Sequence, residues 1–128
     1  MSSARVGRGE ALLLGGYGAS AVLLGAAGAH LLAGRLDAGM LGVWHTAVQY
    51  QFWHTLALAA ALLGLPRGAS LRRMARDAFA AGMLLFCGSL YALALGAPRV
   101  VGLVTPLGGI ALAAGWVALA LAAARARG

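Results

Sequence analysis

The chain has 128 residues, of which 62% are hydrophobic and only 10% are charged, against about 25% charged in ordinary soluble domains. This composition excludes a disordered chain and disfavours a soluble globular one. Four stretches carry no Asp, Glu, Lys or Arg, and each is longer than the roughly 20 residues that a helix needs to cross a bilayer. These stretches are residues 11–34, 38–66, 78–98 and 100–124.

The four stretches predict four transmembrane helices that take up nearly the whole chain. In chain order, we place them at about residues 11–33, 43–65, 76–96 and 101–124. Because the connections between them are short, sequential helices are expected to be antiparallel neighbours. The predicted fold is an all-α membrane protein, a single domain over residues 1–128 that forms an up-down-up-down bundle of four transmembrane helices.

The third and fourth predicted helices begin near capping signals. Ser70 follows a Pro-Arg-Gly turn and is a candidate N-cap of the third helix. Thr105 followed by Pro106 fits an N-cap with proline at the first helical position. The fourth helix then either begins at Pro106, with residues 100–104 as a separate segment, or runs through and kinks at this proline.

The ten basic residues are all arginines, and they are distributed unevenly over the connections. Only Arg35 and Arg99 lie in the first and third connections. The other eight lie at the two termini and around the second connection: Arg5, Arg8, Arg67, Arg72, Arg73, Arg76, Arg125 and Arg127. The positive-inside rule therefore places both termini and the second connection in the cytoplasm, an N-in/C-in topology.

The net charge of +7 would favour nucleic acid as the partner of a soluble protein. In a chain with this arginine distribution, we instead expect the basic rim to contact anionic lipid, with no nucleic-acid partner. The expected location is the bacterial inner (plasma) membrane, which the protein crosses several times. The lipid bilayer is then the first partner, and other membrane proteins or a second copy of the chain are possible further ones.

Small residues recur at helical spacing in the first and fourth predicted helices. The first carries Ala21, Gly25 and Ala29. The fourth carries Gly108, Ala111, Gly115, Ala118 and Ala122. Small residues let helices approach closely in lipid, so we interpret both stripes mainly as intramolecular packing surfaces, with homodimerisation as the alternative.

Polar side chains within the predicted spans fall on one side of the bilayer. With the predicted orientation, the following residues all lie in its outer half: His30, His45, Gln49, Gln51, His54, Ser89, Tyr91 and Thr105. Polar groups at such depth are costly and therefore form the candidate functional set. The inner half is almost entirely apolar.

The second predicted helix carries polar groups on two faces. At 100° per residue, His45, Gln49 and Phe52 share one face, and Gln51 and His54 lie nearly opposite. Both faces need hydrogen-bond partners, because an amide or imidazole that faces lipid loses its hydrogen bonds. We therefore expect this helix to be the most enclosed, or one of its faces to meet another protein or a ligand.

Two interpretations of the polar set stay open. The first is an interhelical hydrogen-bond network that fixes the register of the bundle. The second is an outward-facing polar pocket for a small solute or proton, built around His54, Gln51, Ser89 and Tyr91. The chain contains no motif of a known catalytic, haem-attachment or zinc site, so we predict no enzyme activity, no cofactor and no catalytic, cofactor-binding or metal-ligating residue.

Five motifs follow one another in an order that resembles the YgdD-like family of small inner-membrane proteins, a domain of unknown function with TMEM-type relatives in eukaryotes. The motifs are Gly25-Ala26-Ala27-Gly28-Ala29-His30-Leu31, Tyr50-Gln51-Phe52-Trp53-His54-Thr55-Leu56-Ala57, Gly88-Ser89-Leu90-Tyr91, Thr105-Pro106-Leu107-Gly108-Gly109 and Gly115-Trp116. The resemblance implies four spans and no established biochemical activity. The motifs include His30, Gln51, His54, Ser89, Tyr91, Thr105 and Pro106.

Together these observations favour a non-enzymatic structural or accessory component that associates with other membrane proteins. The small-residue surfaces, the two polar faces of the second helix and the lack of room for a soluble domain support this interpretation. The alternative function is the binding of a small solute or proton in the outward-facing pocket.

Overall fold

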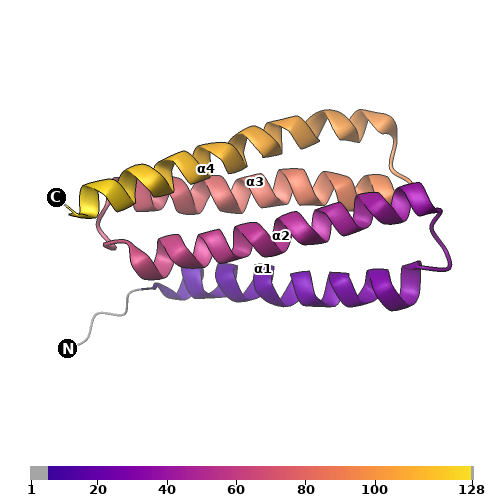
Figure 1. Cartoon of the computed structure of the whole chain (residues 1–128), viewed down its shortest axis with the longest axis horizontal. Coiled ribbons are helices and arrows are strands. Elements are labelled where there is room, and N and C mark those ends of the chain that lie inside the picture. The colour runs from indigo at the N-terminus through magenta and orange to yellow at the C-terminus, as the bar shows by residue number, and fades with distance from the viewer. Residues whose placement is uncertain (1–5, 128) are drawn as a thin grey trace.

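The computed structural model describes residues 6–127, which form four long helices joined by short connections (Figure 1). Arg5, counted above in the basic rim, lies outside the described residues. The elements in chain order are α1 (Arg8–Ala27), a π-helical turn η1 (Gly28–Leu32), α2 (Ala38–Gly64), α3 (Ser70–Ala94), a 3-10 turn η2 (Arg99–Leu103) and α4 (Val104–Arg127). The predicted all-helical class with four helices is confirmed.

The four helices form an open row in which each packs mainly on its neighbours in sequence. α3 packs extensively on both α4 and α2, whereas α1 packs mainly on α2. In Figure 1, α1 and α4 lie at the two edges of this row, and sequential helices run antiparallel. The start of α1, the α2–α3 connection and the end of α4 lie at the same end of the molecule.

α2 begins five residues earlier than predicted, at Ala38 instead of residue 43. The reason is a side-chain cap at the residue before the helix. Asp37 is the N-cap, and its Oδ1 accepts a hydrogen bond from the backbone N–H of Met40 at 2.8 Å. This bond satisfies one of the N–H groups that every helix start leaves without an intrahelical partner.

α3 also begins earlier than predicted, at Ser70 instead of residue 76. Ser70 is the first helical residue and not the N-cap, which is Ala69 with no side-chain cap, so that prediction was wrong. The extra turns are rich in arginine, and Arg72 and Arg76 pair there with an acidic residue of α1. An ion pair with a distant helix is not visible in local sequence patterns.

The start of α4 lies close to the first of the two predicted alternatives. The chain forms the 3-10 turn η2 before α4 begins at Val104, so residues 100–103 are a separate segment. Thr105 and Pro106 lie in the first turn of α4, where the missing N–H of proline costs no intrahelical hydrogen bond. Thr105 is therefore not the N-cap.

Three helical segments are long and apolar enough to cross a membrane: Arg8–Leu32, Ser70–Ala94 and Arg99–Arg125. α2 has 27 residues and is long enough as well, but its glutamine and histidine side chains lower its mean hydropathy. As expected, α2 is the most enclosed helix, since it buries more residues than any other described element.

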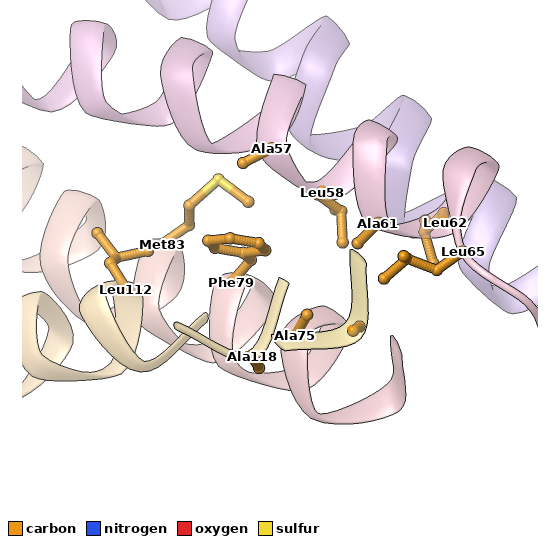
Figure 2. Close-up of a cluster of buried hydrophobic side chains, with 11 residues drawn as sticks. Ala57, Leu58, Ala61, Leu62, Leu65, Ala75, Phe79, Met83, Leu112 and Ala118 are labelled. Carbon is orange, nitrogen blue, oxygen red and sulfur yellow. The ribbon is translucent and has the colours of Figure 1, made fainter. Parts of the chain in front are cut away.

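The main core lies between α2, α3 and α4 (Figure 2). It is built from Ala57, Leu58, Ala61 and Leu62 of α2 with its C-cap residue Leu65, Ala75, Phe79 and Met83 of α3, and Leu112, Ala118 and Ala122 of α4. Glycines bring α3 and α4 together, since the Phe79 ring lies against Gly115 and the Leu112 side chain against Gly82. The small-residue stripe of the fourth helix is thus confirmed as an intramolecular packing surface.

α1 packs on α2 through a similar set of small residues. Ala21 is fully buried, Gly25 faces Val48, and Gly28 lies against the indole of Trp44. The Trp44 Nε1–H also donates a hydrogen bond to the carbonyl of Leu24 at 2.9 Å. The third member of the predicted stripe, Ala29, is exposed, and its neighbour Gly28, the first residue of the π-helical turn, makes the contact instead.

Candidate functional site

Gln51 of α2 joins three helices through its carboxamide. Its Nε2 donates to the carbonyl of Tyr17 at 2.8 Å and to the hydroxyl of Ser20 at 2.7 Å, both on α1. Its Oε1 accepts a hydrogen bond from the hydroxyl of Tyr91 on α3 at 2.8 Å. Gln51 is only 3% exposed, and these three hydrogen bonds satisfy both N–H groups and the oxygen of the buried amide.

A small cavity of about 130 Å³ lies beside this carboxamide. Its lining includes Ser20, Gln51, Cys87 and Tyr91, and the remaining walls are mostly apolar. The cavity is large enough for a few water molecules. It lies between α1 and α3, whose backbones are held apart because α1 packs mainly on α2.

His54 lies in a different environment, among aromatic rings contributed by three helices. Its Nδ1 is 2.7 Å from the carbonyl oxygen of Tyr50, and a carbonyl can only accept, so Nδ1 carries the hydrogen. The imidazole stacks on the Tyr50 ring at 5.7 Å and meets the edge of Trp116 at 5.9 Å. Phe79 completes the surroundings at 6.1 Å.

Ser89 and Thr105 form a third, separate contact, between α3 and α4. Their hydroxyl oxygens are 2.5 Å apart, and the Ser89 hydroxyl also lies 2.9 Å from the carbonyl of Phe86. The contact holds the first turn of α4 against α3. Of the predicted polar set, the structure therefore brings together Gln51 with Tyr91 and Ser89 with Thr105, but it does not gather them with His54 into one site.

The remaining three members of the polar set, His30, His45 and Gln49, are exposed. Within residues 6–127, their side chains make no hydrogen bond. His30 lies in the turn η1, and His45 and Gln49 lie one turn apart on α2, where Phe52 is also exposed. The two faces expected for the second helix are thus present, one enclosed and one open.

We expect Gln51→Leu to lower the free energy of unfolding by about 2 kcal/mol, since interhelical hydrogen bonds contribute about 0.6 kcal/mol each and three are lost. Unfolding of the purified protein by sodium dodecyl sulfate in mixed micelles measures this change. Gln49→Leu is the matched control. The Gln49 side chain is exposed, so the free energy of unfolding of this variant should stay within about 0.5 kcal/mol of that of the parent protein. Equal losses in both variants would contradict the structural role of Gln51.

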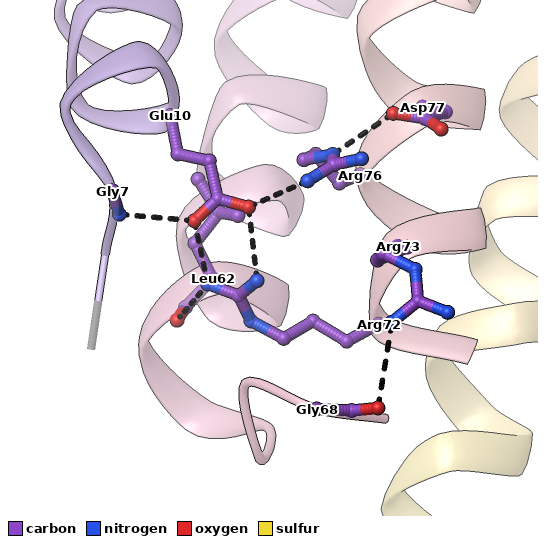
Figure 3. Close-up of polar contacts among 8 residues, drawn as sticks. All are labelled: Gly7, Glu10, Leu62, Gly68, Arg72, Arg73, Arg76 and Asp77. Atoms are coloured by element: carbon purple, nitrogen blue, oxygen red, sulfur yellow. Dashed lines mark hydrogen bonds and ion pairs between the residues drawn. The ribbon is translucent and has the colours of Figure 1, made fainter. Parts of the chain in front are cut away.

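A charged cluster that the sequence analysis did not predict lies where α1 begins (Figure 3). The two carboxylate oxygens of Glu10 each accept a hydrogen bond from Arg72 at 2.9 Å, and Oε2 also pairs with Arg76 at 2.8 Å. Arg72 is only 1% exposed and donates further to the carbonyl of Leu62 at 3.1 Å. On its exposed side, Arg76 pairs with Asp77 at 2.8 Å.

One sequence signal could have pointed to this cluster. Glu10 is the only acidic residue before Asp37, and it directly precedes a long apolar run on the arginine-rich side of the chain. A carboxylate at the edge of a membrane helix favours a basic partner, because an unpaired charge there is costly. The sequence could not indicate which arginine is the partner.

Within the described part of the chain, no three side chains of His, Cys, Asp or Glu are grouped so that they could hold a metal ion. The absence of a metal, cofactor and catalytic group stays a prediction.

Long apolar helices, a core of small and aliphatic residues and buried polar links between helices define the class of the molecule: a helical membrane protein. The family described as "Protein of unknown function (DUF423)" matches residues 24–109. The chain belongs to this family, which confirms the resemblance found in its motifs.

Three relatives cover most of the chain. A UPF0382 membrane protein of Haemophilus influenzae is 41% identical over 99 residues, which are 77% of this chain and 80% of the relative. The UPF0382 membrane protein YwdK of Bacillus subtilis is 41% identical over 107 residues, 82% and 87% of the two chains. The UPF0382 inner membrane protein YgdD of Escherichia coli K12 is 40% identical over 105 residues, which are 81% of this chain and 80% of the relative. No solved structure matches the chain.

Proposed function

We propose that this protein is a non-enzymatic accessory component of the inner membrane that associates with another membrane protein through one face of α2. The observation that carries the proposal is the exposed carboxamide of Gln49. On this face, Gln49 is accompanied by exposed His45, one turn away, and by exposed Phe52.

The depth of Gln49 makes its exposure informative. At 1.5 Å per residue, it lies about 16 Å from the start of α2, well inside a helix of 27 residues. If α2 crosses the bilayer, a carboxamide at that depth faces hydrocarbon and loses its hydrogen bonds unless another protein supplies them. Another chain with a polar side chain in a flat apolar surface would supply the hydrogen bonds of the Gln49 carboxamide and cover the apolar part of this face.

The proposal includes four spans with both termini in the cytoplasm. α2 is long enough to cross, and its most polar side chains are either enclosed by the other three helices or belong to the proposed interface. Arg8, Arg67, Arg73 and Arg76 lie near the same end of the molecule, where the positive-inside rule places the cytoplasm. The name of the Escherichia coli relative supports the inner membrane as the location.

The alternative function is a small-solute or proton site, and one observation favours it: the 130 Å³ cavity beside Gln51 and Tyr91. His54 and Ser89, the other two residues of that hypothesis, do not line this cavity and make separate contacts. The carboxamide next to the cavity is already fully hydrogen-bonded. The arrangement therefore supports a structural role for these groups better than a solute-binding one.

Native gel electrophoresis of gently solubilised membranes tests the association. We expect the tagged protein to migrate well above its monomer mass, and Gln49→Leu to shift it to the monomer. Gln51→Leu is the matched control, because it removes a buried amide and leaves the exposed face intact. A protein that always migrates as a monomer, or a complex that survives Gln49→Leu unchanged, would exclude the proposed interface.

A further inference from the structure

We propose that the groove between α1 and α3 binds one anionic phospholipid, with the lipid phosphate at an arginine-lined cavity and an acyl chain between the two helices. This inference does not depend on the association proposed for α2, which uses another surface. It also holds for either orientation of the chain in the membrane.

The headgroup part of the proposed site is a cavity of about 460 Å³ at the start of α1. Its charged lining residues are Arg8, Glu10, Arg67, Arg72, Arg73 and Arg76. In Figure 3, Arg72 and Arg76 reach across from α3 to the Glu10 carboxylate, whereas Arg73 points to the carbonyl of Gly68. Five arginines and one carboxylate line the cavity, so it stays positive even when Asp77 is counted.

The chemistry of this lining favours a phosphate group. The guanidinium group presents paired N–H donors that match the oxygens of a phosphate, and clusters of arginine at the edge of transmembrane helices recognise anionic lipid headgroups. Arg72 is buried and already donates hydrogen bonds to the Glu10 carboxylate and the Leu62 carbonyl, so its role is to position the cluster. Arg8 and Arg73 line the cavity and are exposed, and Arg73 makes only a long, exposed hydrogen bond of 3.4 Å to the carbonyl of Gly68. We assign these two arginines the direct contacts with the phosphate.

The acyl-chain part is a second cavity of about 310 Å³ further along the same two helices. Its lining is mainly apolar and includes Leu12, Leu13, Gly16 and Leu84. Long side chains bridge α1 and α3 here, as the Tyr17 hydroxyl does by donating to the carbonyl of Ala80. The missing side chain of Gly16 leaves open space, since a Cβ atom there would meet nothing within 4 Å.

The two cavities follow one another as the headgroup and the acyl chain of a phospholipid do, with the basic cavity at the helix end and the apolar cavity further along. Arg76 and Leu84 are eight residues apart on α3, or about 12 Å along the helix axis, so the basic cavity and the apolar cavity follow one another. A soluble phosphate compound would use only the first cavity. A phospholipid uses both, and its acyl chain covers the apolar surface that the separation of α1 and α3 leaves open.

Native mass spectrometry of the purified full chain in dodecyl maltoside tests the site, with phosphatidylglycerol and phosphatidylcholine as the added lipids. We expect one phosphatidylglycerol per chain, bound at least about tenfold more tightly than phosphatidylcholine. Arg8→Gln combined with Arg73→Gln should weaken phosphatidylglycerol binding about tenfold. Arg35→Gln combined with Arg125→Gln removes the same charge outside the cavity and should change binding less than about twofold.

A second pair of variants tests the acyl-chain cavity. Gly16→Leu fills the groove and should weaken phosphatidylglycerol binding several-fold, whereas Gly15→Leu, whose position does not line the cavity and is equally open, should not. Glycerol 3-phosphate, added in excess, should not displace the lipid. Equal binding of the two lipids, equal effects of the two arginine pairs or of the two glycine variants, or displacement by glycerol 3-phosphate would overturn the proposal.

Discussion

Glu10→Ala is expected to destabilise the protein by about 3–5 kcal/mol, the usual cost of removing one partner from a buried ion pair. The substitution leaves the guanidinium group of Arg72, which is 1% exposed, without the carboxylate that accepts two of its hydrogen bonds. It also removes the ionic link between α1 and α3, two helices that do not pack closely on each other. Unfolding in mixed micelles, followed by the loss of helical circular dichroism, measures the effect.

Asp77→Ala is the matched control for this prediction. Asp77 also pairs with Arg76, at 2.8 Å, but its side chain is 70% exposed, so the loss should be below about 1 kcal/mol. The double variant Glu10→Leu with Arg72→Met should recover much of the stability, because it removes both buried charges together. A single Glu10→Ala variant as stable as Asp77→Ala would show that the cluster contributes little to the fold.

Gly108→Ala is expected to cost about 3 kcal/mol, at the upper end of the range for an added group in a well-packed core. A Cβ atom at Gly108 would overlap the backbone nitrogen of Phe86 and lie 2.8 Å from its Cα. Backbone atoms cannot turn away as a flexible side chain can, so α4 must move away from α3 along its whole contact. The same unfolding measurement reports the loss, and weaker protease resistance of the α3–α4 pair should accompany it.

Gly109→Ala provides the control, since it adds the same methyl group at the next residue. There the nearest neighbours are ring atoms of Phe86 at 3.8 and 3.9 Å, an ordinary contact distance. We expect a change within about 0.5 kcal/mol, because the methyl group fits and alanine favours the helix. If both alanine variants were equally stable, the close approach of α3 and α4 at Gly108 would be refuted.

The sequence predicted the number, order and class of the helices because these depend on local composition. Runs without charge, such as residues 78–98, identify long apolar helices directly. The spacing of Gln49 and Gln51 also placed them on two different faces of α2, and the structure encloses one of these faces and leaves the other open. Helix starts were predicted less well, since Asp37 caps α2 through a single side-chain contact six residues before the expected start.

The partners of the polar groups could not be read from the sequence. Gln51 bonds to Tyr17 and Ser20 of α1, residues more than thirty positions away, and the pairing follows from how α1 packs on α2. The same holds for Glu10, whose partner Arg72 is known only once α3 begins at Ser70. The predicted depths placed Gln51, His54 and Ser89 in the same half of the bilayer but could not separate three independent contacts from one common pocket.

In the proposed topology, α2 is a fourth crossing, and its two ends therefore lie on opposite sides of the membrane. Single cysteines at Gly34 and Gly68, in a Cys87→Ala background, test this with a membrane-impermeant thiol reagent on cells, since both glycines are exposed and have open space around them. We predict that Gly34→Cys reacts in intact cells and that Gly68→Cys reacts only after permeabilisation. Labelling of both positions from the same side, or of Gly68→Cys from outside, would contradict the account.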